Sequence, residues 1–530
     1  MGKILFINAS VFLGDGSFTT SIGFDNETGK ILYTGNSPHK NNYDTITDLK
    51  GKLVIPAFTD AHVHLCKGSQ VNSELNLRNA KNYNDVKTSI KSYISSASGS
   101  KKDWITGGYF AESNFESPFK ITKELLDELI PDKPVILSRF DIHSGIANSK
   151  ALEISGLLNE HKRFTESEVI QNASGELTGE VKERALYYII DKISVKSLKE
   201  KASDLRKLID EMHSKGITSI GDITLPEDLD VYEECLKQEE LGLNINCILP
   251  FEEFINIDKY KKRFKEFSEI RFGCFKAFYD GSLSSKTAYY FDYYIGSDSC
   301  GIKTEFVNSG KFNELAHKID KAGYQIAVHA IGDKAVSDLL DLNEKLNEIN
   351  GKRDRRFRIE HAQHIHPKDI QRFIDLNVIA SVQPSHLFSD ASTSNELLKY
   401  PEREHSYKKI IEAGGKVILG TDYPIVDYSP FETIFFAVTR IAKGFEKGFF
   451  EENKFTIEDS IKCYTSENSF ATFQESEKGT LKEGMTADLV VLNKNIFEVQ
   501  PNEIKYLKPV LTIKDGRIIY SDEASAISKE

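Results

Sequence analysis

Short apolar runs alternate with longer amphipathic stretches through the middle of the chain. Runs of this length and composition are typical of strands that are buried on both faces. Strands that alternate with helices indicate βα units, so eight such runs predict a (β/α)8 barrel. The eight predicted strands are Leu53–His64, Ile217–Thr224, Ile245–Phe251, Ile270–Asp280, Tyr324–Asp333, Arg356–Gln363, Val378–His386 and Lys416–Pro424.

Both ends of the chain show a different pattern, with short strand-like runs separated by turns. The Asp515-Gly516 step between two apolar runs is typical of a hairpin. We expect residues 1–55 and 475–530 to form one small β-sandwich domain, and residues 56–474 to form the barrel. The strand-like runs at the two ends are Lys3–Leu13, Ile31–Tyr33, Asp488–Asn493 and Val510–Tyr520.

The predicted barrel is interrupted once. Its first and second strands are separated by about 150 residues, far more than a crossover connection needs. We therefore predict an inserted subdomain at about residues 67–210. An insertion after the first strand leaves the barrel at its C-terminal mouth, where barrel enzymes hold their catalytic groups.

Composition narrows the choice of partners and of compartment. The net charge of −12 argues against a nucleic-acid partner, because phosphate binding requires clustered Lys and Arg. The chain has no apolar run long enough for a membrane span, so we expect no membrane partner. Six cysteines without a CxxC pair favour a reducing, cytoplasmic location. For the oligomeric state, a homodimer is one alternative.

Four histidines and one aspartate fall at the C-terminal ends of predicted strands. His62 and His64 share one face of the first strand, because side chains at i and i+2 point the same way. His329, His361 and Asp422 end the fifth, sixth and eighth strands. Each of them alone is more often a core or turn residue. Together they predict a site for one or two divalent metal ions, with zinc as the first choice.

The run Pro56-Ala-Phe-Thr-Asp-Ala-His62-Val-His64 resembles the first-strand motif of the amidohydrolase superfamily. The order HxH, Lys, His, His, Asp is similar to the ligand series of that superfamily. Other stretches resemble its YtcJ-like branch, the amidohydrolase-3 group that includes N-substituted formamide deformylases. These stretches are Trp104–Gly108, His143–Leu152, Gly175–Glu180, Lys276–Leu283, His329–Asp333, Gln383–His386 and Gly479–Val491.

The resemblance implies a special role for Lys276, near the end of the fourth strand. A plain ammonium is repelled by a dication, whereas a lysine carboxylated by carbon dioxide bridges two metals in related enzymes. Burial would lower the pKa of this lysine and free its amine to react. The alternative is a lysine paired with Asp280 at the barrel mouth, beside a single metal.

The resemblance also implies which residues bind each of the two metal ions. His62 and His64 would bind the more buried metal with Asp422, and His329 and His361 would bind the second. Asp422 would act as base and proton shuttle for a water activated by the metal.

Three further residues are candidates for substrate contacts. His143, in the insertion, is a candidate catalytic group that hydrogen-bonds the substrate or its oxyanion, or else a plain loop histidine. Asp280 and Gln383 end the fourth and seventh strands. His364 and His366 are expected on the surface.

The leading hypothesis is therefore a metal-dependent amidohydrolase that cleaves the C–N bond of an N-formyl or N-acyl amine. Its expected partner is a small-molecule amide. Hydrolysis of a cyclic amide or imide, or deamination, would use the same site with a different pocket. A hypothesis of another class is a catalytically silent relative with a regulatory or binding role.

Overall fold

The computed structural model describes residues 2–96, 103–110, 112, 115–116, 119–139, 143–193, 196–238 and 241–522. The chain divides into two compact units. One comprises Met1–Leu65 and Ile209–Glu530, and the other comprises Cys66–Leu208. The second unit thus interrupts the first at a single place along the chain.

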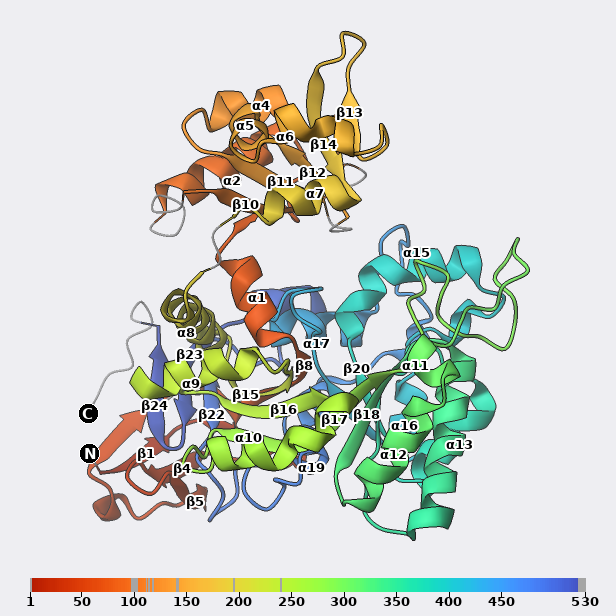
Figure 1. The fold of residues 1–530 in the computed structure, drawn as a ribbon. Coiled ribbons are helices and arrows are strands. Elements are labelled where there is room, and N and C mark those ends of the chain that lie inside the picture. Colours follow the sequence, from red (N-terminus) through yellow and green to blue (C-terminus); the bar gives the residue numbers. More distant parts are fainter. Residues whose placement is uncertain are drawn as a thin grey trace. The chain divides into compact units, whose positions relative to one another are not determined.

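An eight-stranded parallel sheet forms the centre of the first unit (Figure 1). The last strand meets the first beyond its end, where Val63 bridges to Tyr423. There the backbone N–H of Asp422 donates to the carbonyl of His62, at 2.7 Å. The predicted (β/α)8 barrel is confirmed. In spatial order its strands are β8 (Phe58–Val63), β15 (Ile217–Ile223), β16 (Asn244–Pro250), β17 (Ile270–Phe278), β18 (Gln325–Ala330), β19 (Arg358–His361), β20 (Ile379–Val382) and β21 (Lys416–Leu419).

Helices follow the barrel strands and cover the outside of the sheet (Figure 1). In α12 the buried residues Phe312, Ala316 and Ile319 recur at helical spacing, so one apolar stripe faces the sheet. No helix among the described residues has the length and apolar character that a membrane crossing requires. The main helices are α9 (Asp228–Gln238), α10 (Ile257–Arg263), α12 (Lys311–Lys321), α13 (Asp333–Asn350), α14 (Ile370–Asp375), α15 (Leu387–Leu397), α16 (Lys408–Glu412), α17 (Pro430–Thr439), α18 (Ile457–Tyr464) and α19 (Ser466–Ala471).

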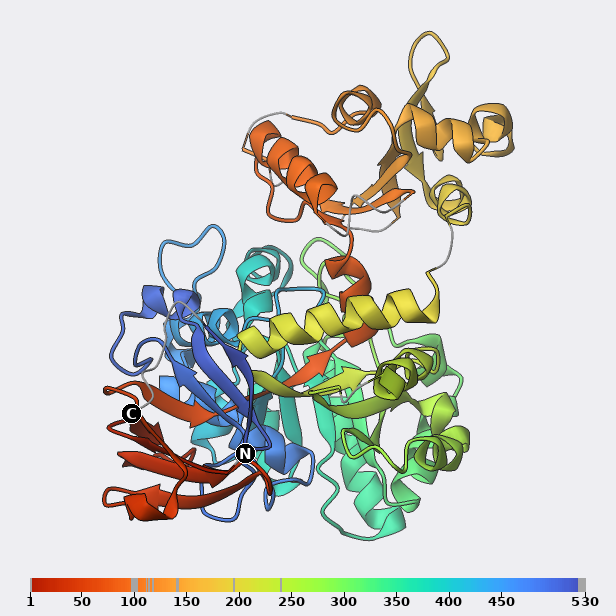
Figure 2. The ribbon, with the colours of Figure 1, turned by 90° about the vertical axis from the view of Figure 1, so that its left-hand side faces the viewer.

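Strands from both ends of the chain form the β-sandwich, and they lie side by side in Figure 2. One sheet has the order β5-β4-β1-β6 and the other the order β24-β23-β22-β7-β2-β3. Their shared core joins Phe6 and Phe24 of the first sheet to Val491 and Ile513 of the second. The strands are β1 (Lys3–Ile7), β2 (Ser10–Phe12), β3 (Phe18–Thr19), β4 (Ser21–Asp25), β5 (Lys30–Gly35), β6 (Thr45–Asp48), β7 (Leu53–Pro56), β22 (Leu489–Leu492), β23 (Pro509–Lys514) and β24 (Arg517–Ser521).

The predicted strand Leu53–His64 is in fact two strands in different sheets. β7 pairs with β2 and β22 of the sandwich, whereas β8 pairs with β15 of the barrel. The change occurs at Ala57, whose N–H donates to the carbonyl of Asp488, while the next N–H, that of Phe58, donates to Gly216. One continuous apolar run thus serves two domains, which hydrophobicity alone does not reveal.

The second unit holds a six-stranded mixed sheet in the order β13-β14-β12-β11-β10-β9. Side chains of β11 alternate between two cores: Leu137 packs with Ile90 and Leu126, and Ile136 packs with Leu186. The sheet is therefore covered on both faces. Its elements are β9 (Leu75–Asn76), α2 (Tyr83–Ser95), β10 (Ile105–Phe110), α4 (Lys123–Leu129), β11 (Val135–Arg139), β12 (Ser144–Ala147), α5 (Ser149–Ile154), α6 (Leu157–Glu160), β13 (Val169–Gln171), β14 (Leu177–Lys182) and α7 (Glu183–Ile190). Two helices, α1 (Leu65–Asn72) and α8 (Leu198–Ser214), cross the boundaries between the units.

Candidate metal centre and active site

The side chains inside the barrel are apolar in one layer and polar in the next layer toward the C-terminal mouth. Cys274 of β17 and Ala327 of β18 belong to an apolar cluster inside the sheet. Two residues further along the same strands stand Lys276 and His329, which share the faces of Cys274 and Ala327. Polar groups thus replace apolar ones toward the C-terminal mouth.

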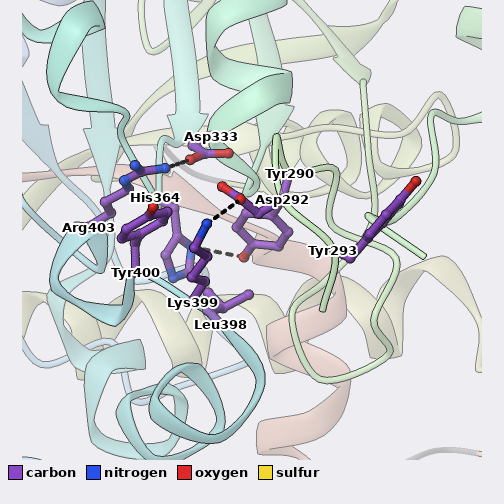
Figure 3. Close-up of a pocket in the computed structure, with 9 residues that line it drawn as sticks. All are labelled: Tyr290, Asp292, Tyr293, Asp333, His364, Leu398, Lys399, Tyr400 and Arg403. Atoms are coloured by element: carbon purple, nitrogen blue, oxygen red, sulfur yellow. Dashed lines mark hydrogen bonds and ion pairs between the residues drawn. The ribbon is translucent and has the colours of Figure 1, made fainter. Parts of the chain in front are cut away.

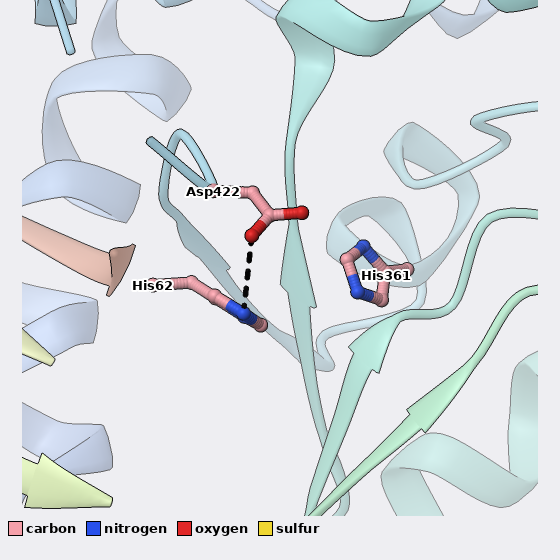
Figure 4. Close-up of side chains that lie close together, drawn as sticks. All are labelled: His62, His361 and Asp422. Carbon is pink, nitrogen blue, oxygen red and sulfur yellow. Dashed lines mark ion pairs between the residues drawn. The ribbon is translucent and has the colours of Figure 1, made fainter. Parts of the chain in front are cut away.

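His62, His361 and Asp422 form a compact buried cluster at this mouth (Figure 4). Each residue offers one ligand atom, and these atoms lie within 4.8 Å of one another. Asp422 Oδ1 lies 3.5 Å from His62 Nε2 and 3.2 Å from His64 Nε2. His62 and His361 have ring centroids 5.3 Å apart. Imidazole and carboxylate donors at such distances fit one divalent metal ion.

The His329 ring adjoins this cluster, with its centroid 4.5 Å from that of His361. Its Nε2 lies 3.1 Å from the carbonyl of Gly281, a hydrogen bond that leaves Nδ1 as the remaining ligand atom. The resemblance pairs His361 with His329 on a second metal, whereas the structure groups His361 with His62 and Asp422.

The orientation of His62 is fixed by Glu360, a buried carboxylate that the sequence analysis did not single out. His62 Nδ1 lies 2.6 Å from Glu360 Oε2, so Nδ1 carries the proton and Nε2 stays free as a ligand atom. Glu360 is itself held by Arg358 Nε at 2.7 Å and by the Ser381 hydroxyl at 2.7 Å. The only signal in the sequence is a pair of charged residues at i and i+2 in a buried strand.

Asp60 holds the segment that carries Asp422. Its carboxylate accepts hydrogen bonds from the backbone N–H groups of His62 and Thr421 and from the Thr421 hydroxyl. Asp422 and His361 both have left-handed backbone conformations, with φ of 61° and 70°. Such conformations cost free energy in residues with a side chain and persist where the surroundings impose them, often at functional sites.

Burial and neighbouring charge keep the imidazoles of the cluster neutral. Burial, assisted by the charge of Lys276, lowers the pKa of His62 to about 4 and that of His329 to about 4. Burial and the nearby histidines hold the pKa of His361 well below its usual value. Metal ligation requires the neutral imidazole, so these rings are ready to bind at neutral pH.

Burial alone would raise the pKa of Asp422, but His62, His64 and His386 outweigh it and hold that pKa below its ordinary value. Likewise, Arg358 and His62 outweigh burial and lower the pKa of Glu360. Both carboxylates are therefore ionised at neutral pH.

The Lys276 amine is buried without a hydrogen-bond partner among the described residues. Burial lowers its pKa to about 8, partly opposed by Glu360 and Asp422. The alternative ion pair with Asp280 is not formed. Asp280 instead accepts the backbone N–H groups of Tyr289, Ile331 and Gly332, and so ties together the loops after β17 and β18.

Two other predicted contact residues lie as follows. Gln383 is buried, and its side-chain amide donates to the carbonyl of Ser381. His143 belongs to the second unit, where it is exposed and its Nδ1 lies 3.4 Å from Glu183 Oε2. The catalytic role given to His143 stays a prediction.

His386 is a mouth residue whose own role the sequence analysis missed. It ends a short 3-10 helix, Pro384–His386, directly after β20, and its ring centroid lies 6.3 Å from that of His361. It belongs to the stretch Gln383-Pro-Ser-His386, in which only Gln383 was predicted to contact the substrate. Asp222 was likewise left aside; its Oδ1 accepts the N–H of Leu65 at 2.7 Å, where the second unit begins.

The expectation that His364 lies on the surface is wrong. His364 is buried, with Nε2 2.5 Å from Glu404 Oε2 and Nδ1 3.0 Å from the Tyr290 hydroxyl. It lines a small cavity in which Arg403 pairs with Asp333 (Figure 3). Loops from later in the chain cover this position, which the end of a predicted strand does not foretell.

Relatives of known sequence share nearly the whole length of the chain. The LONG AFTER FAR-RED 3 protein of Arabidopsis thaliana is 28% identical, over 94% of this chain and 88% of its own. The YtcJ protein of Bacillus subtilis is 27% identical, over 89% and 90%. The N-substituted formamide deformylase of Arthrobacter pascens is 24% identical, over 99% and 99%. The resemblance to the YtcJ-like branch is confirmed.

A solved structure has the same fold. An uncharacterized metal-dependent hydrolase from Pyrococcus horikoshii OT3 superposes with a TM-score of 0.73 at 23% identity, over 94% of this chain and 99% of the other. Residues 45–520 match the profile of the amidohydrolase family, a range that covers the barrel, the insertion and about half of the sandwich strands. The chain is therefore a member of the amidohydrolase family.

Proposed function

We propose that this protein is a metal-dependent hydrolase that cleaves the C–N bond of an N-formyl or N-acyl amine. The observation that carries the proposal is the convergence of His62, His361 and Asp422 at the barrel mouth, together with a buried Lys276 amine that has no hydrogen-bond partner among the described residues. The 24% identical N-substituted formamide deformylase supports this choice among the reactions that such a site serves.

The donor set fits a divalent metal, and zinc suits its nitrogen and oxygen ligands. His62, His64, His361 and Asp422 would hold the ion, and His329 would extend the site toward a second one. A divalent metal bound here acidifies water toward neutral pH and polarises a carbonyl oxygen. Carboxylation of Lys276 would replace its ammonium charge with a carbamate, whose negatively charged oxygens suit a metal site.

Asp422 supplies the base. Its carboxylate is ionised at neutral pH, so it accepts the proton of the attacking water and later delivers that proton to the leaving nitrogen. Glu360 keeps the proton on His62 Nδ1, and Asp60 fixes the Thr421 backbone beside Asp422. These contacts hold the reacting groups in place before substrate binds.

A screen of N-formyl amines, N-acyl amines and cyclic amides, combined with metal analysis, tests the proposal. We expect the zinc-loaded protein to release amine from at least one open-chain amide and to lose this activity with a chelator. If only cyclic amides are turned over, the protein is instead a hydrolase of cyclic amides or imides. A fully metal-loaded protein that is inert toward every amide would favour a regulatory role.

A further inference from the structure

The inference concerns His386 and rests on the proposed function. His386 stands at the start of α15, one strand away from the segment that carries Asp422. Its ring centroid lies 6.3 Å from that of His361, and its Nε2 contacts the residue that precedes Asp422, so the ring is near the two buried ligands. Unlike them it is partly exposed, and it is not one of the three residues whose ligand atoms converge.

A backbone carbonyl fixes which nitrogen of His386 carries the proton. Nε2 lies 3.3 Å from the carbonyl oxygen of Thr421. A carbonyl oxygen only accepts hydrogen bonds, so Nε2 must donate, and in the neutral imidazole Nδ1 then holds a lone pair. Thr421 is itself anchored through its N–H and its hydroxyl to the buried Asp60 carboxylate, which gives the imidazole a rigid support.

The Nδ1 atom of His386 has no hydrogen-bond partner in the described part of the chain. It is also not a buried atom. It is therefore an accessible acceptor on a ring whose centroid lies 6.3 Å from that of His361. Hydrolysis of a C–N bond places a carbonyl oxygen and an amide nitrogen at the cluster. A metal bound there would polarise the carbonyl oxygen. The N–H of a secondary amide needs a hydrogen-bond acceptor of its own.

We propose that His386 Nδ1 accepts a hydrogen bond from the N–H of the scissile amide. The site is thereby specific for amides that carry an N–H group, and it discriminates against N,N-disubstituted amides. A pocket built to hydrogen-bond a substrate group rejects analogues that lack it, because its own polar atom is then left unpaired. His386 is in this role a specificity-determining residue and not a metal ligand.

The test compares formanilide, which carries an N–H, with N-methylformanilide, which does not. The measured quantity is the discrimination factor, the ratio of their kcat/KM values. Replacing His386 with Gln retains a group near Nε2 but none near Nδ1, so we expect the factor to fall by about tenfold or more. His386→Asn places an acceptor near Nδ1 and should restore part of it. The extra bulk of the methyl group is the same for every variant and cancels in the comparison.

Two controls accompany these variants. Bound metal, measured by elemental analysis, should be unchanged in His386→Gln, which separates substrate recognition from metal ligation. His366→Gln removes another partly exposed imidazole, in the loop after β19, and should leave the factor unchanged.

The outcomes separate this inference from the proposed function. If the wild-type protein cleaves both compounds and His386→Gln has the same factor, the inference is wrong and the proposed function stands. If His386→Gln loses metal, His386 is a ligand and the inference is wrong. If the wild-type protein cleaves no open-chain amide of the screen, the proposed function is itself overturned, together with the inference.

Discussion

His361 ends β19 and His364 follows three residues later, and both are buried, yet their surroundings are opposite. His361 lies among other imidazoles, and burial with their charge holds its pKa well below the usual value. His364 contacts Glu404, and that carboxylate raises the pKa of His364 against the effect of burial. Burial alone therefore does not tell a functional histidine from a structural one.

The difference lies in how the polar groups around each histidine are satisfied. Glu404 lies against His364, and its other oxygen accepts the Gln363 amide at 2.9 Å. Arg440 donates to the backbone carbonyl of Glu404 at 3.0 Å. At the mouth, by contrast, the Lys276 amine has no hydrogen-bond partner among the described residues. The charges around His364 are thus paired within the chain, whereas Lys276 forms no ion pair with the described residues, and a buried cation of that kind is suited to a site that binds a ligand.

The largest expected effect is on turnover at the mouth. Replacing Asp422 with Asn removes the base and one metal ligand, so turnover of the amide found in the screen should fall by about 10³-fold. The fold should persist, as circular dichroism would report. Near-normal turnover would remove Asp422 from the mechanism.

The matching change in the other network should affect stability instead. Glu404→Gln leaves the buried His364 without its counter-charge, so the free energy of unfolding should fall by about 3 kcal/mol. Urea unfolding measures this loss. Turnover per folded molecule should stay near that of the wild type; a drop comparable to that of Asp422→Asn would mean that the two networks act as one.

Lys276→Met should act in opposite directions on stability and on metal binding. It removes a buried amine that has no hydrogen-bond partner among the described residues, so the metal-free protein should gain about 1–3 kcal/mol in the free energy of unfolding. Bound metal should fall to one equivalent or less, since the bridging group is lost. Destabilisation of the metal-free protein would show that the lysine is compensated there. Full loading with two metals would end the bridging role.

The smallest expected effects are on how the free energy of unfolding depends on pH, to which His62 and His364 contribute slopes of opposite sign. The folded pKa of His62 is about 4, below the unfolded value near 6.5. The unfolded state therefore binds more protons in this range, and stability is lost as pH falls from 6.5 to 4. The folded pKa of His364 is raised, so its contribution is complete below 6.5 and is lost as pH rises through the folded value.

Paired variants isolate the two slopes in the metal-free protein. Each group contributes at most about 1.4 kcal/mol per pH unit. Relative to the wild type, His62→Gln should flatten the acid side of the stability profile, and His364→Gln the neutral-to-alkaline side. Slopes that are unchanged by either variant would contradict the assigned environments.

The alternation of apolar runs with helical stretches was enough to predict the barrel, because that signal is the local order along each strand and helix. The position at strand ends singled out His62, His361 and Asp422, whose ligand atoms the structure brings together. Glu360 and His386 were not singled out because their contacts lie on other segments that fold against them, His62 and Ser381 for Glu360 and Thr421 for His386. The same limit explains His364, whose partner Glu404 follows forty residues later in the sequence.

The hydrogen bond from Leu65 to Asp222 has a consequence for the evolution of the chain. It pins the backbone one residue before the inserted unit begins, and the other Asp222 oxygen is held by the Tyr232 hydroxyl at 2.6 Å. Substitutions, insertions and deletions beyond this clamp are mechanically insulated from the strand that bears His62. Changes of sequence or length in the inserted unit therefore need not displace the strand that carries His62.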